Sequence, residues 1–175
     1  MTREKRGILL LPIVAAAVLL IDQITKYLVR TTLPEGRSMD LVPWLTPIFR
    51  ITHVTNTGVA FGLFPQGSYF FIGVAVVVIA AIIVYYRHLP DGQWLTRVAL
   101  GLQLGGASGN LIDRLRYQGR VIDFIDLNFW PLQHWPVSNI ADISIVSGVI
   151  LLALTMLWEE RQLAREEQQK SAEYG

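Results

Sequence analysis

The chain has 175 residues, of which 52 % are hydrophobic and 17 % are charged, and its formal net charge is +1. A soluble domain of average composition carries about 25 % charged residues, so this composition favours a membrane protein. The small net charge argues against a nucleic-acid partner. The absence of cysteine excludes disulfides, thiolate metal sites and a cysteine nucleophile.

Four segments approach the length of about 20 mainly apolar residues that a spanning helix needs. They cover residues 8–29, 69–86, 94–112 and 137–158. The first follows a basic N-terminus, as the apolar part of a secretory signal does, but its apolar character continues to Val29 without a polar cleavage region. We therefore expect a retained first span rather than a removed signal peptide.

The segment between the first two spans predicts a small extracytoplasmic β-sheet at about residues 33–64. FRITHVT (Phe49 to Thr55) is rich in β-branched residues and alternates as a strand does, and prolines and glycines on both sides supply turns. By itself, NTGVAFG (Asn56 to Gly62) indicates only a loop in which Asn56 is a turn residue.

The third span carries three glycines at intervals of four residues, Gly101, Gly105 and Gly109. This spacing lines one helix face with hydrogen atoms, so a second helix can approach closely. Helix packing is the expected role of this face.

The segment VIDFIDLNFWPLQHWP, between the last two spans, combines aromatic residues with Asp123 and Asp126. Trp130 and Trp135 suit the headgroup layer, so we expect a helical segment that lies along the membrane surface. The charged tail, residues 159–175, predicts a solvated helix or a fraying end. The expected fold is an all-α polytopic membrane protein with four transmembrane helices and a small sheet, forming a single domain over residues 1–175.

Ionisable side chains at membrane depth cost at least about 2.5–3.5 kcal/mol each, so a chain keeps them where they pair, face a cavity or do chemistry. Asp22 and Lys26 have the favourable order and spacing for a helical ion pair, and structural pairing near the end of the span is the simpler interpretation. Asp113 beside Arg114 forms either an interfacial charge pair or part of a site. The amide of Asn110 requires a partner.

Two further carboxylates lie in apolar surroundings, Asp123 in VIDF and Asp142 about one and a half turns inside the fourth span. Asn139 shares a helix face with Asp142. Two carboxylates in one pocket share a proton, and such a pair activates water when one accepts its proton and the other donates to a substrate carbonyl. The spacing alone leaves a catalytic pair, a structural role and a proton relay open.

Other catalytic patterns find little support. The three histidines, His53, His88 and His134, lack metal-ligand spacing, so we expect no metal. Nothing in the spacing favours a serine–lysine dyad that would use Lys26. No phosphate-binding glycine loop or nucleic-acid module is present in the sequence.

Five motifs, taken in order, resemble those of the bacterial lipoprotein signal peptidases, or type II signal peptidases. They are DQITK (Asp22 to Lys26), NTGVAFG (Asn56 to Gly62), GGASGNLIDR (Gly105 to Arg114), VIDF (Val121 to Phe124) and NIAD (Asn139 to Asp142). Each is weak alone, but their order and their positions relative to four spans make the combination specific. One departure is Ser138, where the family commonly has an aromatic residue.

The resemblance implies an intramembrane aspartic endopeptidase that removes the signal peptide of prolipoproteins just before the diacylglyceryl-modified cysteine. It implies Asp123 and Asp142 as the catalytic pair, with Asp22 and Lys26 shaping and supporting the site. The residues implied to position the substrate and stabilise the developing oxyanion are Asn56, Asn110, Arg114 and Asn139. No metal or organic cofactor is expected.

The partners implied are lipid-modified preproteins and membrane lipids, and the location is the bacterial inner membrane. Basic residues divide almost equally between the two sides of the membrane, so the resemblance decides the orientation: both termini cytoplasmic, the site towards the extracytoplasmic face. Four spans suffice for one site, so a monomer is expected. The alternatives are a proton-coupled transporter with Asp142, Asp113 and Lys26 as a relay, and a non-catalytic membrane assembly factor. The lack of an internal repeat argues against the transporter.

Overall fold

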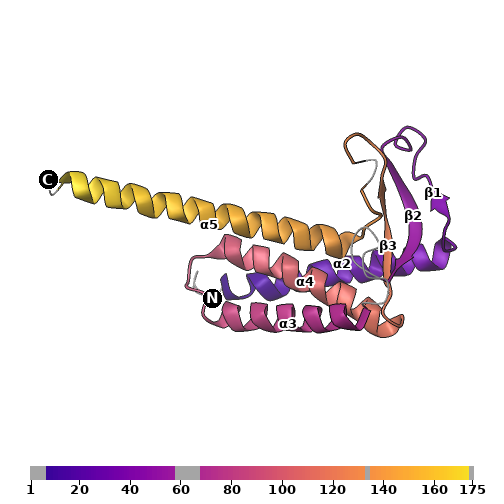
Figure 1. Cartoon of the computed structure of the whole chain (residues 1–175), viewed down its shortest axis with the longest axis horizontal. Helices are drawn as coiled ribbons and strands as arrows, with labels where there is room; N and C mark the ends of the chain where they lie inside the picture. The colour runs from indigo at the N-terminus through magenta and orange to yellow at the C-terminus, as the bar shows by residue number, and fades with distance from the viewer. Residues whose placement is uncertain (1–6, 58–67, 133–134, 174–175) are drawn as a thin grey trace.

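The computed structural model describes residues 7–57, 68–132 and 135–173 (Figure 1). These residues form four long helices, α2 (Leu10–Thr32), α3 (Ser68–Arg87), α4 (Trp94–Arg116) and α5 (Ile140–Glu173). Three antiparallel strands, β1 (Ser38–Met39), β2 (Phe49–Asn56) and β3 (Val121–Leu127), form a sheet in that order. Figure 1 shows the sheet at one end of the helices, with α5 extending far beyond them at the other end.

Three of the described helices are long and apolar enough to cross a membrane, Leu10–Thr32, Tyr69–Arg87 and Ile140–Ser171. Their outward faces carry large apolar side chains, such as Leu20 at 61 % exposure and Val77 at 67 % exposure, as helices in contact with lipid require. The prediction of a polytopic helical membrane protein is confirmed for these three spans. The remaining helix, α4, has 23 residues and glycines and polar side chains in its interior.

The central helix α4 packs against α2, α3 and α5. Gly105 faces α2, where an added Cβ would lie 2.7 Å from the carbonyl oxygen of Ala15 and 2.7 Å from Cβ of Val18. Gly106 faces α5, where an added Cβ would collide with the carbonyl oxygen of Ala141. The predicted close approach along the glycine face is therefore confirmed, and two neighbouring glycines bring two helices close to α4.

The segment that follows α4 differs from the prediction. The predicted surface-lying helix is wrong here: Val121–Leu127 is a strand paired with β2, and residues 130–132 form a turn. The first five residues of β3 are all buried, and four of them are apolar without strict alternation, as is typical of a strand covered on both faces. The sheet predicted at residues 33–64 is confirmed for β1 and β2, its third strand comes from elsewhere, and residues 58–64 lie outside the described part.

The last helix begins later and ends later than predicted. It begins at Ile140, so Asp142 lies in its first turn rather than one and a half turns inside. It continues to Glu173, which confirms a helix for the described part of the charged tail. In the third predicted span, α4 continues to Arg116, so Asp113 and Arg114 are helical. Most of the motif NTGVAFG lies outside the described residues.

We predict that Gly105→Ala lowers the melting temperature of the detergent-solubilised protein, because the added methyl group must displace the α2 backbone at Ala15. Overpacking of this kind costs about 1–3 kcal/mol. The matched control is Gly73→Ala on α3, where an added Cβ meets nothing within 4 Å. The control should melt at or slightly above the temperature of the parent. Tryptophan fluorescence measures the melting of both variants. Equal melting temperatures would contradict the close α2–α4 contact.

Candidate active site

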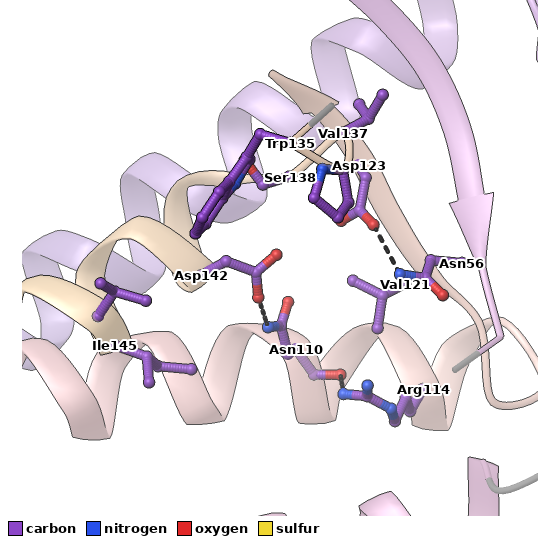
Figure 2. A pocket seen from close by; sticks show the side chains of 12 residues that line it. Asn56, Asn110, Arg114, Val121, Asp123, Trp135, Val137, Ser138, Asp142 and Ile145 are labelled. Carbon is purple, nitrogen blue, oxygen red and sulfur yellow. Dashed lines mark hydrogen bonds between the residues drawn. The ribbon is translucent and has the colours of Figure 1, made fainter. Parts of the chain in front are cut away.

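A cavity of about 220 Å³ lies where the start of α5 and the strand β3 meet α4 (Figure 2). Its polar lining residues are Asn56, Asn110, Arg114, Asp123, Ser138 and Asp142. Apolar side chains, among them Val121, Trp135 and Ile145, form the rest of the wall. The structure therefore brings five of the eight predicted site residues to one cavity, although they come from four elements of the chain, β2, α4, β3 and α5.

Asp123 reaches the cavity from β3 and is only 2 % exposed. Its Oδ1 accepts a hydrogen bond of 2.6 Å from Nδ2 of Asn139, and its Oδ2 accepts one of 3.2 Å from Nδ2 of Asn56. Burial raises the pKa of Asp123 to about 7, and the carboxylate of Asp142 adds to the rise. The amides of Asn139 and Asn56 oppose the rise in pKa. Asp123 therefore exchanges its proton close to neutral pH.

Asp142 reaches the same cavity from the first turn of α5. Its Oδ1 accepts a hydrogen bond of 2.7 Å from Nδ2 of Asn110 on α4 (Figure 2). Its backbone N–H donates to Oδ1 of Asn139 at 2.9 Å, so Asn139 caps the start of the helix. Since the amide nitrogen of Asn139 also contacts Asp123, this one side chain bridges the two acidic residues.

The start of α5 is held beside β3 through the backbone of Ser138. Its carbonyl oxygen accepts hydrogen bonds from the N–H groups of Phe124 and Ile125, and its own N–H donates to the carbonyl oxygen of Ile125 at 3.0 Å. These bonds fix the separation of the strand that carries Asp123 from the helix that carries Asp142. Because the backbone makes these bonds, a serine can hold this position.

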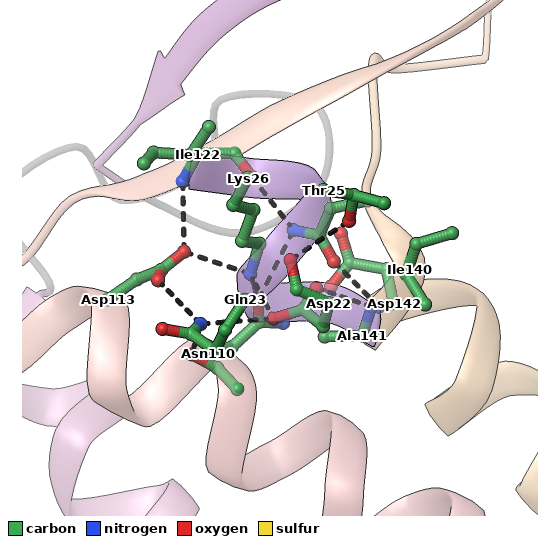
Figure 3. Close-up of polar contacts among 12 residues, drawn as sticks. Asp22, Gln23, Thr25, Lys26, Asn110, Asp113, Ile122, Ile140, Ala141 and Asp142 are labelled. Carbon is green, nitrogen blue, oxygen red and sulfur yellow. Dashed lines mark hydrogen bonds and ion pairs between the residues drawn. The ribbon is translucent and has the colours of Figure 1, made fainter. Parts of the chain in front are cut away.

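Behind the cavity lies a buried charge cluster, defined as Asp22, Lys26 and Asp113 (Figure 3). Nζ of Lys26 lies 2.9 Å from Oδ2 of Asp22 and 2.9 Å from Oδ2 of Asp113. It also donates to Oδ1 of Asn110 at 3.0 Å. None of the three charged side chains is more than 2 % exposed. Lys26 therefore links the charge cluster to the amide that contacts Asp142.

The two carboxylates of the charge cluster also accept backbone hydrogen bonds. Oδ1 of Asp22 accepts from the N–H of Ala141 at 3.0 Å, and Oδ2 of Asp113 accepts from the N–H of Ile122 at 3.2 Å. Ala141 and Ile122 directly precede Asp142 and Asp123 in the sequence. The charge cluster thus positions the backbone beside both cavity-facing aspartates.

The predicted pairing of Asp22 with Lys26 is confirmed, although Lys26 is buried rather than extended towards the interface. Asp113 was interpreted either as an interfacial charge or as part of a site. It is 1 % exposed and pairs with Lys26, so the interfacial interpretation is wrong. Arg114 lines the cavity, donates from Nη1 to the carbonyl oxygen of Asn110 at 3.4 Å, and lies 5.7 Å from the ring of Phe71.

One polar contributor was missed by the sequence analysis. Nε2 of Gln23 donates to Oδ1 of Asp113 at 3.0 Å and contacts Asp22 at 3.2 Å. Gln23 is a polar residue in an otherwise apolar span and lies between Asp22 and Lys26. This position could have indicated its contribution to the site. The apolar wall, including Trp135 and Ile145, had no comparable signal.

The fold and the cavity define a helical membrane protein that carries a preorganised pair of acidic side chains beside a small sheet. A family model described as signal peptidase (SPase) II matches residues 14–158, and the chain belongs to this family. It is therefore a peptidase, and the alternative of a proton-coupled transporter is not supported.

Individual relatives agree with the family. The lipoprotein signal peptidase of Moorella thermoacetica is 44 % identical over 154 residues, which cover 88 % of this chain and 97 % of that protein. That of Geobacter metallireducens is 46 % identical over 157 residues, 88 % of this chain and 94 % of the relative. A bacterial membrane enzyme solved by the in meso method at 2.3 Å resolution is similar, with a TM-score of 0.78 and 33 % identity over 86 % of this chain and 88 % of its own.

We predict that Lys26→Met destabilises the protein strongly, because it leaves Asp22 and Asp113 buried without their cation. Removing one partner of a buried ion pair costs about 3–5 kcal/mol. The control is Arg50→Met, which removes an exposed pair with Asp40 and should cost about 0–1 kcal/mol. Thermal unfolding in the same detergent measures both variants. Equal melting temperatures for Lys26→Met and Arg50→Met would contradict the stabilising role of the charge cluster.

Proposed function

We propose that this chain is an aspartic endopeptidase of the bacterial inner membrane that cleaves prolipoproteins just before their diacylglyceryl-modified cysteine and so removes the signal peptide. Membership of the signal peptidase II family supports lipoprotein signal peptide cleavage. The observation that carries the aspartic mechanism is that Asp123 and Asp142, the latter from a different element, line one cavity and are both held by asparagine amides.

In this mechanism, the ionised carboxylate of Asp142 accepts a proton from a water molecule whose oxygen attacks the scissile carbonyl carbon. The neutral carboxyl of Asp123 donates its proton to the carbonyl oxygen, which gives a neutral tetrahedral diol. Collapse of the diol breaks the C–N bond: Asp142 gives its proton to the departing nitrogen, while the ionised Asp123 takes back a proton from a diol hydroxyl. The products are a free amine and a carboxylic acid, and both aspartates return to their starting protonation states. The raised pKa of Asp123 suits the acid, and the position of Asp142 in the first turn of α5 suits a negative charge.

The surroundings of the carboxyls fit this division of roles. Asn110, Asn139 and Asn56 donate to the two aspartates and hold them in position. Arg114 supplies a positive charge at the cavity wall, where it stabilises the developing oxyanion and orients the peptide. No step requires a metal or an organic cofactor.

An apolar cavity beside Asp142 supports a lipid-modified substrate. It has a volume of about 230 Å³ and shares Trp135, Ser138, Asp142 and Val146 with the active-site cavity. Its other walls include Leu127, Leu132 and Ile143. A hydrocarbon chain in this space would lie directly beside the carboxylate, with the scissile peptide in the more polar cavity.

We further propose that α4 is the fourth span and that both termini are cytoplasmic. At about 1.5 Å per residue its 23 residues extend about 35 Å, enough to cross the hydrocarbon core. Figure 1 shows the N-terminal and C-terminal helices both leading away from the sheet, which supports both termini on one side and the sheet on the other. The whole chain then forms one domain and acts as a monomer whose partners are preprotein substrates and membrane lipids.

We predict that Asp123→Asn and Asp142→Asn each abolish cleavage of a diacylglyceryl-modified prolipoprotein, because an amide can neither accept the water proton nor supply the acid proton. A mobility shift of the purified substrate on a gel measures cleavage. The control is Asp126→Asn on the same strand, where the carboxylate accepts a hydrogen bond from Thr52. Full activity in either of the first two variants would refute the aspartic mechanism.

The same assay tests the proposed substrate by comparing the cleavage rates of modified and unmodified prolipoprotein. The unmodified prolipoprotein should be cleaved far more slowly, because it cannot place an acyl chain beside Asp142. Equal rates for modified and unmodified substrate would refute lipid recognition while leaving the peptidase mechanism standing.

We predict that activity falls as the pH rises above about 7, because the proposed acid is the neutral form of Asp123. Its pKa is raised to about 7, so the carboxyl is neutral below that pH and ionised above it. A single ionisation of this kind lowers kcat/KM by about tenfold per pH unit beyond the midpoint. A profile measured from pH 5 to pH 9 tests the sign. Activity that increases through pH 7 would reverse the roles of the two aspartates.

A further inference from the structure

A second pocket lies on the sheet face opposite the active-site cavity. Its volume is about 360 Å³, and its charged lining residues are Arg30, Glu35, Arg116 and Arg120. Three arginines and one glutamate give this basic pocket a formal charge of +2. The proposed peptidase mechanism uses none of these side chains.

Strand alternation separates the basic pocket from the active site. Successive side chains of a strand point to opposite faces. On β3, Ile122 lines the basic pocket, whereas Val121 and Asp123 line the active-site cavity. On β2, Thr55 lines the basic pocket and the next residue, Asn56, lines the active-site cavity. The two sites therefore lie back to back across the same pair of strands.

His53 places a buried acceptor in the basic pocket. Its side chain is 5 % exposed, and Nδ1 lies 2.7 Å from the carbonyl oxygen of Leu33. A carbonyl oxygen only accepts, so Nδ1 carries a proton and Nε2 of the neutral ring is an acceptor. In the described part of the chain, Nε2 is buried and has no hydrogen-bond partner. A buried acceptor without a donor is costly, and a ligand hydroxyl would satisfy it.

The basic pocket lies at the ends of two membrane helices, α2 and α4. Arg30 lies in the last turn of α2, and Arg116 is the last residue of α4. Close before them in the sequence, Leu28 is 51 % exposed and Leu115 is 66 % exposed. The guanidinium of Arg30 lies 5.3 Å from the centre of the Tyr117 ring. Cationic side chains thus adjoin an apolar outer surface, the arrangement that a phospholipid at the membrane boundary requires.

We propose that the basic pocket binds the headgroup of an anionic phospholipid. The headgroup is a phosphodiester that carries a free hydroxyl, and phosphatidylglycerol is the simplest lipid of this kind. Arg30, Arg116 and Arg120 bind the phosphate oxygens, as guanidinium groups do. The headgroup hydroxyl donates to Nε2 of His53. The acyl chains lie along the apolar surface of the helices beside Leu28.

Glu35 adds selectivity for a diester over free phosphate. It lines the pocket and accepts a hydrogen bond from Thr55, so it stays beside any bound anion. A second negative charge on the ligand would be repelled by this carboxylate, and inorganic phosphate carries more negative charge at neutral pH than a phosphodiester does. The bound headgroup would also hold β2 against β3 where Thr55 pairs with Ile122.

The test uses the full-length chain, purified in a neutral detergent and titrated with short-chain phosphatidylglycerol, with the melting temperature as the readout. We expect a rise in melting temperature that saturates with lipid concentration. Arg120→Gln should weaken the apparent affinity about tenfold, as expected for the loss of one charged hydrogen bond. The matched control is Arg50→Gln, an arginine of the same sheet that lies outside the basic pocket and pairs with Asp40. Equal weakening in both variants, or no saturable rise, would refute the site.

Three further ligands test the chemistry. Short-chain phosphatidylcholine should raise the melting temperature much less than phosphatidylglycerol, and an equal rise would refute selection by charge. An equal rise with inorganic phosphate would show a free-phosphate site and overturn the lipid assignment. Phosphatidylmethanol is an anionic phosphodiester without a headgroup hydroxyl, so it should bind more weakly. Equal affinity would refute the contact with His53. All these measurements follow binding, so their outcome is independent of peptidase activity.

Discussion

A single buried ammonium group that faces two carboxylates is the constraint on which the rest of this structure depends. Removing each ion from water costs several kcal/mol, and mutual attraction offsets that cost only where the geometry is close and the remaining lone pairs are satisfied. Lys26 meets Asp22 on its own helix and Asp113 on α4 at 2.9 Å each. Both carboxylates then accept backbone N–H groups, from α5 and β3 respectively. The requirement to satisfy three charges therefore fixes four elements relative to one another.

The same constraint orients the amides that hold the two cavity-facing aspartates. An ammonium group only donates, so the contact of Lys26 with Asn110 must be to the amide oxygen, and the amide nitrogen is left to face Asp142. The oxygen of Asn139 accepts from the backbone of Asp142, which directs its nitrogen to Asp123. Each amide is thus oriented by a group that allows only one direction. A carboxyl pair held in this way needs no rearrangement before it meets a substrate.

A structural feature is predictable from this sequence when it depends on residues close together in the chain. Features that depend on contacts between distant segments are not. Spans, the close approach at Gly105 and the Asp22–Lys26 pair depend on residues within a few turns, and hydropathy or helical spacing predicts them. The strand β3 was mistaken for a surface helix because both of its faces are covered, so its apolar residues do not alternate. The pairing of Asp113 with Lys26 joins two helices, and no local pattern indicates it. The spacing of Asp123 and Asp142 alone does not predict that they line one cavity. Only the resemblance carried by the five ordered motifs indicated this pair.

The helix α4 shows why hydropathy is an incomplete guide to this fold. A helix surrounded by other helices does not contact lipid over most of its surface, so its inward faces are free to carry glycine and polar residues. Asn110 and Asp113 are buried against α2, β3 and α5, where Asn110 bonds to Lys26 and Asp142, and Asp113 bonds to Lys26 and the backbone of Ile122. The glycines that lower the hydropathy of α4 are the residues that let α2 and α5 approach it. Low hydropathy in α4 is therefore a consequence of its central place, and the polar site exists because that place is shielded from lipid.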